Sequence, residues 1–270
     1  MELYLEGELA QAWPNDDPFE VLLRMEGEVF RALEGRTTLR FELNEKHYFL
    51  KRHLGVGWGE IAKNLLTGKW PITGAGNEWR ALHHLRAHGV NTAVPLAFGQ
   101  RGVNPARRQS VLVMSELSRM TDLEKLTAGW GAFPPSYTFR KQVIDAVADT
   151  ARTMHGCGLN HRDFYLCHLW LPDACLDEAE PVRLYVIDLH RAQIRSRVPR
   201  RWLIKDLGAL YYSALNSGIT RRDVVRFLRR YTGQSVHHLL REDGPFWQAV
   251  SDRAVAIYQR DFGKAPGLPF

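Results

Sequence analysis

Two stretches of the sequence decide the fold: NHRDFYLCH at residues 160–168 and VIDLHRAQ at residues 186–193. The first follows a run of apolar residues at helical spacing that ends at Gly156, so we expect Asp163 in a loop just after a helix. The second continues an apolar run, Val-Arg-Leu-Tyr-Val-Ile, which predicts a strand with Asp188 at its C-terminal end. Carboxylates on such supports can accept a proton from a hydroxyl and hold a divalent cation. Phosphoryl transfer needs both functions, because its transition state spreads negative charge that a metal and cations must neutralise.

The first part of the chain has the pattern of an antiparallel sheet. Residues 27–51 combine short β-rich runs with polar turns, which predicts a three-strand meander. Two further strands are expected near residues 96–99 and 110–114. Between them and the meander, residues 78–88 repeat apolar side chains at helical spacing and stop at Gly89. We therefore expect five strands and one main helix.

A Gly/Trp-rich insertion at residues 55–76 separates the meander from this helix. It contains Trp58 and Trp70 and a short helix expected around residues 60–66. The two tryptophans fit two alternatives, which are plugs in a hydrophobic core and amphipathic anchors at a lipid headgroup boundary.

The pattern changes after residue 117, from strands to helices. A fold of the α+β class with two lobes follows: residues 1–117 form a sheet lobe, residues 118–270 form a mostly helical lobe, and a cleft is expected between them. The helices expected in the second lobe cover residues 139–156, 201–216, 221–231 and 245–259.

The order of these motifs resembles the protein-kinase fold. Residues 161–163 (HRD) resemble its catalytic-loop motif, and residues 188–190 (DLH) occupy the position of its metal-binding DFG motif. Lys51 resembles the lysine that grips the phosphates of ATP, and Glu78 resembles the ion-pair partner of that lysine. Asp206 resembles the acid that braces the catalytic loop from below.

This resemblance implies a role for each site residue. Asp163 is then the catalytic base or the group that positions the acceptor hydroxyl, and Asp188 binds Mg²⁺. The backbone of Glu116 and Leu117, in the segment between the lobes, would meet the adenine edge of ATP.

The sequence departs from the kinase pattern at two points that bear on these roles. No glycine-rich loop precedes the phosphate-gripping lysine, so Arg36 is expected to supply charge to the nucleotide. His168 replaces the catalytic-loop asparagine. It is a candidate metal ligand beside Asp188, although imidazole is a poor ligand for Mg²⁺, and also a candidate catalytic residue that donates a hydrogen bond to phosphate. Arg162 fits either a catalytic role or a scaffolding role beside nearby carboxylates.

A narrower resemblance covers nearly the whole chain. GVGWGEIAKNLLTGKWP (residues 55–71), GAGNEW (residues 74–79) and the two stretches that decide the fold are similar to the bacterial lipopolysaccharide core heptose kinases of the WaaP or RfaP type. This implies ATP-dependent phosphorylation of the first heptose of the inner core. The acceptor would be the nascent core glycolipid, and the enzyme would be cytoplasmic and peripheral to the inner membrane.

Composition agrees with an anionic partner. The 270 residues are 45% hydrophobic and 24% charged, as in ordinary folded proteins, with 36 Lys+Arg against 30 Asp+Glu. The Arg-rich segments at residues 191–201 and 221–230 can meet the phosphates and acidic sugars of a glycolipid. The second segment predicts a helix with a basic face, suited to an acidic protein such as acyl carrier protein. No basic leader and no long apolar run is seen, so we expect neither a cleaved signal nor a membrane span.

Three other functions fit parts of the sequence. The first is a protein kinase, including tyrosine self-phosphorylation, although the peptide-binding and activation-loop features are missing. The second is a pseudokinase scaffold that binds an acidic carrier protein or a membrane, which the missing glycine loop and His168 favour. Nucleic-acid binding is suggested only by charge, because the sequence holds no recognisable module for it.

Overall fold

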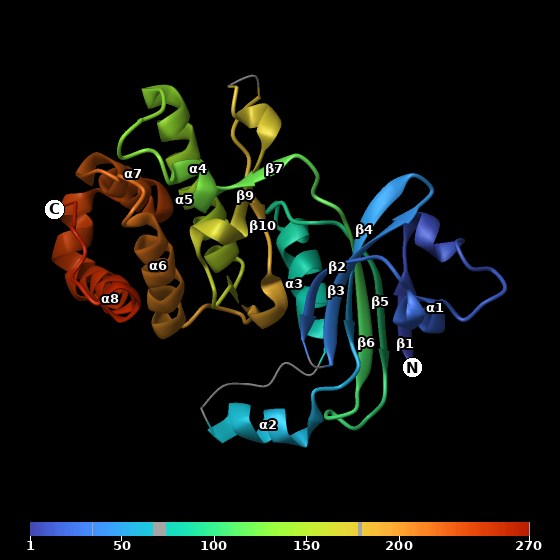
Figure 1. The fold of residues 1–270 in the computed structure, drawn as a ribbon. Coiled ribbons are helices and arrows are strands. Elements are labelled where there is room, and N and C mark those ends of the chain that lie inside the picture. The colour runs from blue at the N-terminus through green and yellow to red at the C-terminus, as the bar shows by residue number, and fades with distance from the viewer. Residues whose placement is uncertain (34, 67–73, 178–179, 270) are drawn as a thin grey trace. The chain divides into compact units, whose positions relative to one another are not determined.

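The computed structural model describes residues 1–33, 35–66, 74–177 and 180–269. The chain forms two compact units, coloured along the chain in Figure 1. The sheet unit contains Met1–His84, Ala93–Ser118 and Leu189–Arg191, and the helical unit contains Leu85–Thr92, Arg119–Asp188 and Ala192–Phe270. The lobe boundary at residues 117/118 stays a prediction.

The sheet unit is built on a six-stranded antiparallel sheet with the strand order β1-β5-β6-β4-β3-β2. The predicted meander is confirmed as β2, β3 and β4, in which β3 pairs antiparallel with both β2 and β4. The third strand of the meander continues two residues beyond Lys51, where we had expected it to end. The strands are β1 (Glu2–Leu5), β2 (Glu28–Leu33), β3 (Arg36–Leu43), β4 (Lys46–His53), β5 (Pro95–Arg101) and β6 (Gln109–Ser115).

The prediction of five strands is wrong by one, because β1 was missed. This strand pairs antiparallel with β5, where Leu3 lies opposite Gly99. Its signal is only four residues long: Leu3 and Leu5 are half-buried, and Glu2 and Tyr4 are exposed. So short an alternation becomes a strand only when an edge is available to pair with it.

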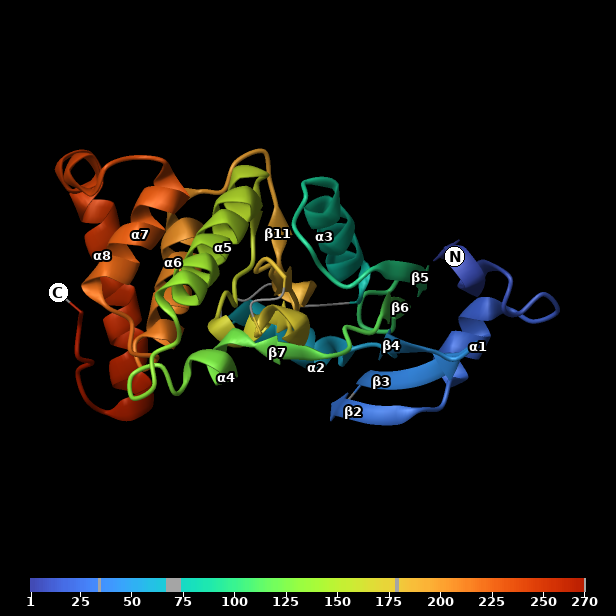
Figure 2. The same ribbon diagram turned by 90° about the horizontal axis from the view of Figure 1, so that it is seen from above.

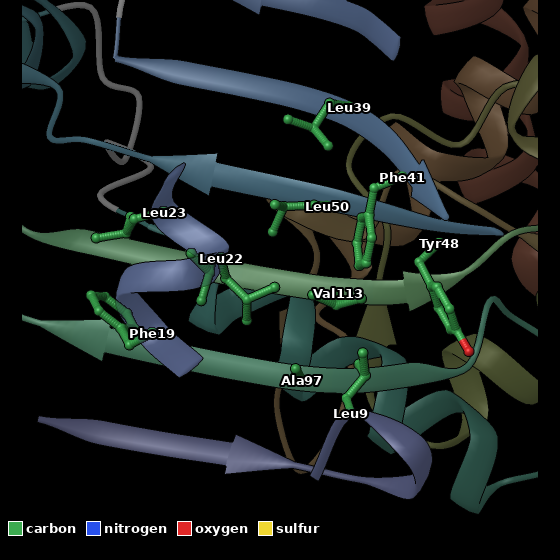
Figure 3. Close-up of a cluster of buried hydrophobic side chains, with 11 residues drawn as sticks. Leu9, Phe19, Leu22, Leu23, Leu39, Phe41, Tyr48, Leu50, Ala97 and Val113 are labelled. Atoms are coloured by element: carbon green, nitrogen blue, oxygen red, sulfur yellow. The ribbon is translucent and has the colours of Figure 1, made fainter. Parts of the chain in front are cut away.

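One face of the sheet carries a hydrophobic core, shown in Figure 3. The helix α1 (Pro18–Arg24) lies on this face, and the Asp17 side chain caps it by accepting a hydrogen bond from the Phe19 N–H at 2.9 Å. Tyr48 and Leu50 of β4 point into this core, so the alternation of the strand directs Lys51 to the opposite face. The core contains Leu9, Phe19, Leu22, Leu23, Leu39, Phe41, Tyr48, Leu50, Ala97, Val111 and Val113.

The other face carries α3 (Gly76–Ala87), the predicted main helix. It begins two residues earlier than expected and ends before Gly89, whose φ of +78° terminates the helix. Trp79 stacks on Phe98 of β5 with ring centres 5.6 Å apart. Asn77 lies in the first turn of this helix, and its side-chain amide donates to the His190 carbonyl at 3.0 Å.

The Gly/Trp-rich insertion contains α2 (Gly57–Leu66), which is longer than the expected helix. Trp58 is 60% exposed, so its interpretation as a core plug is wrong. Trp70 lies outside the described residues.

The helical unit consists mainly of four long helices, which Figure 2 shows side by side. Helix α6 packs against α8, and α5 packs against α7. The helix expected at residues 245–259 is the second half of a longer one, which bends at Asp243 just before Pro245. The helices are α4 (Leu123–Thr127), α5 (Tyr137–Gly156), α6 (Arg200–Ala214), α7 (Arg221–Thr232) and α8 (Val236–Phe262).

Short strands support the loops of the helical unit. They form a three-stranded sheet in the order β10-β9-β7 and the pair β11-β8. The strand predicted over residues 182–187 is reduced to β10, so Asp188 comes two residues after a strand. The strands are β7 (Met120–Asp122), β8 (Leu159–Asn160), β9 (Leu169–Pro172), β10 (Tyr185–Val186) and β11 (Gln193–Ile194). Short 3₁₀ helices cover Gly7–Ala10, Leu166–His168, Asp173–Cys175 and Leu189–Arg191.

Among the described residues, no helix offers an apolar stretch long enough to cross a lipid bilayer.

Candidate functional site

Lys51 and Glu78 form an ion pair in the sheet unit. The Lys51 Nζ lies 2.6 Å from the Glu78 Oε1, and the Glu78 side chain is only 4% exposed. Strand pairing with Thr38 and Leu112 fixes the Lys51 backbone, and α3 supplies Glu78 from its first turn. A buried carboxylate thus holds one ammonium group in a defined place while the lysine keeps a 21% exposed side chain.

Arg36 lies near this pair in the same sheet. It begins β3, opposite His53 at the end of β4. Burial, together with the charges of Arg36 and Lys51, lowers the pKa of His53 to about 4. The imidazole is therefore neutral at pH 7, and the positive charge of this end of the sheet comes from the arginine and the lysine.

Glu116 and Leu117 follow β6. The Glu116 N–H donates to the His47 carbonyl at 3.2 Å, and the Glu116 carboxylate pairs with Arg40 at 2.9 Å. The Glu116 N–H is thus engaged within the sheet unit. The groups left to make the predicted contact with adenine are therefore the Glu116 carbonyl and the Leu117 backbone.

In the helical unit, Asp206 braces the loop that carries Asp163. The Asp206 carboxylate is fully buried and accepts the backbone N–H of His161 at 2.6 Å and that of Arg162 at 2.8 Å. Arg162 has φ +77°, in the left-handed region that an arginine seldom adopts. The two hydrogen bonds from α6 hold this backbone in place.

His161 is a scaffold of the same loop. Its ring is fully buried, which lowers its pKa and keeps it neutral. The Nε2–H donates to the Ile187 carbonyl at 2.9 Å, and Nδ1 accepts the Asp163 N–H at 3.4 Å. The ring therefore connects the Asp163 loop to the segment that precedes Asp188.

His168 lies between the two candidate acids. Its Nδ1–H donates to the Asp163 backbone carbonyl at 2.6 Å, and its Nε2 lies 3.6 Å from the Asp188 carboxylate. Asp188 has φ +60°, a left-handed conformation that turns its side chain out of the strand direction. The Nε2 atom of His168 therefore faces a carboxylate oxygen of Asp188. A carboxylate is the ligand type that Mg²⁺ prefers, so Asp188 suits that ion, and the imidazole adds a nitrogen donor.

The structure thus brings Asp163, Asp188, Arg162 and His168 together in the helical unit, and Lys51, Glu78 and Arg36 in the sheet unit. Two features of the helical unit were not predicted from the sequence, a set of cations around Trp202 and an apolar cavity. Apolar residues on several faces of α5, α6 and α7 were a signal for the cavity.

The apolar cavity has a volume of about 350 Å³. Three polar atoms at its wall, Thr127 Oγ1, Tyr211 OH and Trp247 Nε1, are buried without a hydrogen-bond partner among the described residues. Buried polar atoms are normally paired, so these three are exceptions within the described part of the chain. The apolar lining includes Leu123, Trp130, Val143, Val147, Leu207, Leu210 and Phe227.

Helix α7 has the expected basic face. Arg222 and Arg229 are exposed, and Arg226 donates to the Tyr137 hydroxyl at 2.7 Å. Arg230 is ion-paired with Asp149 at 2.7 Å, so its charge is largely offset. The same helix lines the cavity with its apolar side, including Phe227.

Comparisons with known proteins agree on one family. A family model described as "Lipopolysaccharide kinase (Kdo/WaaP) family" matches residues 20–231. Among curated proteins, the lipopolysaccharide core heptose(I) kinase WaaP of Pseudomonas aeruginosa is 45% identical over 96% of this chain and 97% of its own length. The protein of the same name from Escherichia coli K12 is 42% identical over 95% of this chain and 97% of its own length. A solved structure of WaaP in complex with acyl carrier protein has a TM-score of 0.83 and 40% identity, and covers 96% of this chain and 100% of that chain.

Proposed function

The chain belongs to the lipopolysaccharide kinase (Kdo/WaaP) family, and from this premise we propose that it transfers the γ-phosphoryl group of ATP to the first heptose of the lipopolysaccharide inner core. Its family makes it a phosphotransferase with an alcohol acceptor, a lipopolysaccharide core heptose kinase with a protein-kinase-like fold. The observation that carries the proposed chemistry is the His168 bridge between the Asp163 carbonyl and the Asp188 carboxylate.

Each site residue has a role in this proposal. Asp163 orients the acceptor hydroxyl and takes its proton as the hydroxyl oxygen bonds to the γ-phosphorus of ATP. The bond from that phosphorus to the bridging oxygen breaks, and ADP leaves. Lys51, held by Glu78, neutralises phosphate oxygens of the nucleotide, and Arg36 adds charge from the same unit.

Asp188 and His168 would hold Mg²⁺ in this scheme. Bound there, the metal would shield charge on the phosphates and orient them. Arg162 contributes through its backbone, which Asp206 holds in place next to Asp163.

The test uses labelled ATP and a core glycolipid that lacks phosphate. Asp163→Asn and Asp188→Asn should each lower kcat/KM by at least ~10²-fold, because each removes an ionised group from the reaction. Asp252→Asn, which changes an exposed acid of α8, should keep wild-type activity. Normal turnover in either site variant would contradict the assignment.

The same preparations distinguish the alternative functions. Label on a polypeptide and none on the glycolipid would indicate a protein kinase. A pseudokinase scaffold would show neither label nor a rise in melting temperature with ATP and Mg²⁺, whereas a nucleotide-binding enzyme must be stabilised by its ligand.

The proposal extends to location and to a protein partner. We place the enzyme at the cytoplasmic face of the inner membrane, where a nascent glycolipid acceptor would be met by basic surfaces. The partner is an acyl carrier protein, since a relative has been solved with one. Helix α7 supports this through its exposed arginines and its apolar side, which lines a cavity of about 350 Å³ suited to an acyl chain.

Two variants test the partner. Ala214→Trp fills the cavity from the end of α6, and the matched control Ala256→Trp places the same side chain on an exposed part of α8. In gel filtration, wild type and control should retain an acyl-loaded carrier protein, and the cavity variant should lose it. Equal retention of a carrier without an acyl chain would show that the cavity has no part in binding.

A further inference from the structure

Helix α2 of the sheet unit exposes a row of apolar side chains. Trp58, Ala62 and Leu66 follow one another at the spacing i, i+4 and i+8, so they lie on one side of this helix. Trp58 is 60% exposed and Leu66 is 88% exposed, whereas Ile61 is buried. The helix therefore buries one apolar side against the protein and presents a second apolar side to solvent.

The exposed row continues onto neighbouring turns at one end of the sheet. Leu54, which follows β4, is 52% exposed, and Val103, in the turn between β5 and β6, is 96% exposed. The Gly57 N–H at the start of α2 donates to the Ala106 carbonyl of this turn at 3.0 Å, which holds the helix beside the turn (Figure 1). Single exposed apolar residues are common, but a group of them on adjoining segments marks an interaction surface.

Basic side chains adjoin these apolar residues. The turn between β5 and β6 contains Arg107, which is exposed, and Arg108, and it has no acidic residue. Arg108 donates to the Gly102 carbonyl at 3.3 Å, a neutral group that does not offset its charge. The opposite end of the sheet exposes the acids Glu42 and Glu45. An anionic surface would therefore attract the first end of the sheet in preference to the second.

We propose that this surface docks on the anionic headgroups of a membrane, with its apolar side chains at the boundary between headgroups and acyl chains. The inference rests on the proposed function and names the surface by which the enzyme reaches its lipid-linked acceptor. An indole and aliphatic side chains enter this boundary, and arginines add attraction to lipid phosphates; one of these signals alone gives only weak, reversible binding. We call this surface the Trp58 patch, and it consists of Leu54, Trp58, Leu66, Val103, Arg107 and Arg108.

A membrane fits the Trp58 patch better than a second copy of this chain does. In a symmetric dimer the patch would face itself, and its arginines would meet like charges. A membrane is also where the proposed acceptor lies. Because Leu54 follows shortly after Lys51 in the chain, docking would bring the lysine of the proposed mechanism near that acceptor.

Sedimentation with vesicles of phosphatidylglycerol and phosphatidylethanolamine at low ionic strength tests the patch. Trp58→Ser should weaken binding about tenfold, because it removes the large apolar anchor. Trp58→Phe should keep most of the binding. The double variant Arg107→Gln/Arg108→Gln should lose about fivefold for each arginine.

Matched variants in the helical unit are the controls. Phe133→Ser removes an aromatic side chain that is 82% exposed, and Arg152→Gln/Arg197→Gln removes two charges from exposed positions. Both should bind vesicles within about threefold of wild type, since they retain the patch. Equal losses in the patch variants and the control variants would show that binding has no defined surface, which overturns the inference.

Kinetics separate docking from catalysis. With the acceptor glycolipid embedded in the same vesicles, the patch variants should raise the KM for the acceptor by the factors seen in sedimentation, with kcat within about twofold of wild type. With a deacylated, soluble acceptor they should match wild type. An equal rise in KM for the soluble acceptor would mean that the patch acts on the active unit and not on a membrane, and this too would overturn the inference.

Two results distinguish this inference from the proposed function. If wild type binds the vesicles through the patch but transfers no phosphate to either acceptor, the patch stands and the proposed function fails. If wild type phosphorylates the soluble acceptor but does not bind the vesicles, or forms a dimer in gel filtration that Trp58→Ser dissociates, membrane docking is rejected and the proposed function stands.

Discussion

At the scale of single residues, the ion pair between Lys51 and Glu78 is asymmetric. Glu78 is almost fully buried, whereas a fifth of the Lys51 side chain is exposed. Lys51→Met leaves a buried carboxylate without its partner and should destabilise the fold by about 3 kcal/mol. Glu78→Gln removes the charge from the buried side and should leave the fold nearly as stable.

Both variants should lower kcat/KM for ATP. The lysine variant should lower it more, by ~10²-fold or more, because of these two residues only the lysine contacts phosphate in the proposed mechanism. Urea unfolding and ATP kinetics on the two variants check this. Equal stabilities of the two variants would contradict the asymmetry.

His53 makes stability depend on pH. Its pKa falls from an ordinary 6.5 to about 4 on folding, so between these values the unfolded chain binds a proton that the folded chain does not. The stabilisation that comes from the neutral His53 should therefore be complete above pH 6.5. The free energy of unfolding should decrease as the pH falls from 6.5 toward 4, by up to about 3 kcal/mol. Burial of His161 acts in the same direction.

Urea unfolding at several pH values measures this slope. His53→Gln should flatten it, and His237→Gln, at an exposed position, should not. An unchanged slope in His53→Gln would show that another group causes the pH dependence of the stability.

At the scale of elements, α6 determines the shape of the catalytic loop. Asp206 of this helix accepts two backbone N–H groups of the loop while its own side chain is fully buried. Asp206→Ala should destabilise the protein by about 3 kcal/mol or more, since both N–H groups lose a charged acceptor. Asp206→Asn keeps one carbonyl oxygen and should be milder.

Denaturant unfolding and kinase assays separate the two effects. The asparagine variant should remain folded but lose turnover, as the left-handed Arg162 backbone relaxes. Wild-type turnover in Asp206→Asn would mean that the loop keeps its shape without this brace.

At the scale of the whole molecule, the net charge of +6 predicts salt-dependent membrane binding. Vesicles with an anionic phospholipid should bind the protein at low ionic strength and release it at high ionic strength. Salt screens the attraction, with a Debye length of about 10 Å at 0.1 M. Neutral vesicles should not bind. Sedimentation at two salt concentrations checks this, and binding to neutral vesicles would point to an apolar anchor such as the exposed Trp58.

Local patterns predicted much of the fold. The meander and the main helices follow from alternation and helical spacing, and their ends from glycine and proline. The helix bend before Pro245 was missed because a proline normally begins a helix, and β1 because four alternating residues are too weak a signal without a partner strand. The order of Lys51, Glu78, Asp163 and Asp188 was likewise readable, since the sequence predicts a strand, a helix or a loop at each of these positions.

Periodicity and motif order were enough to assign the class of fold, the family and the candidate acids and lysine, because both are properties of neighbouring residues. Only the tertiary structure decided that His168 bridges Asp163 and Asp188, that Asp206 holds the loop, that four cations share Trp202 and that a cavity opens among the helices. Each of these depends on contacts between residues far apart in the chain, whose distances are set by packing and leave no local pattern.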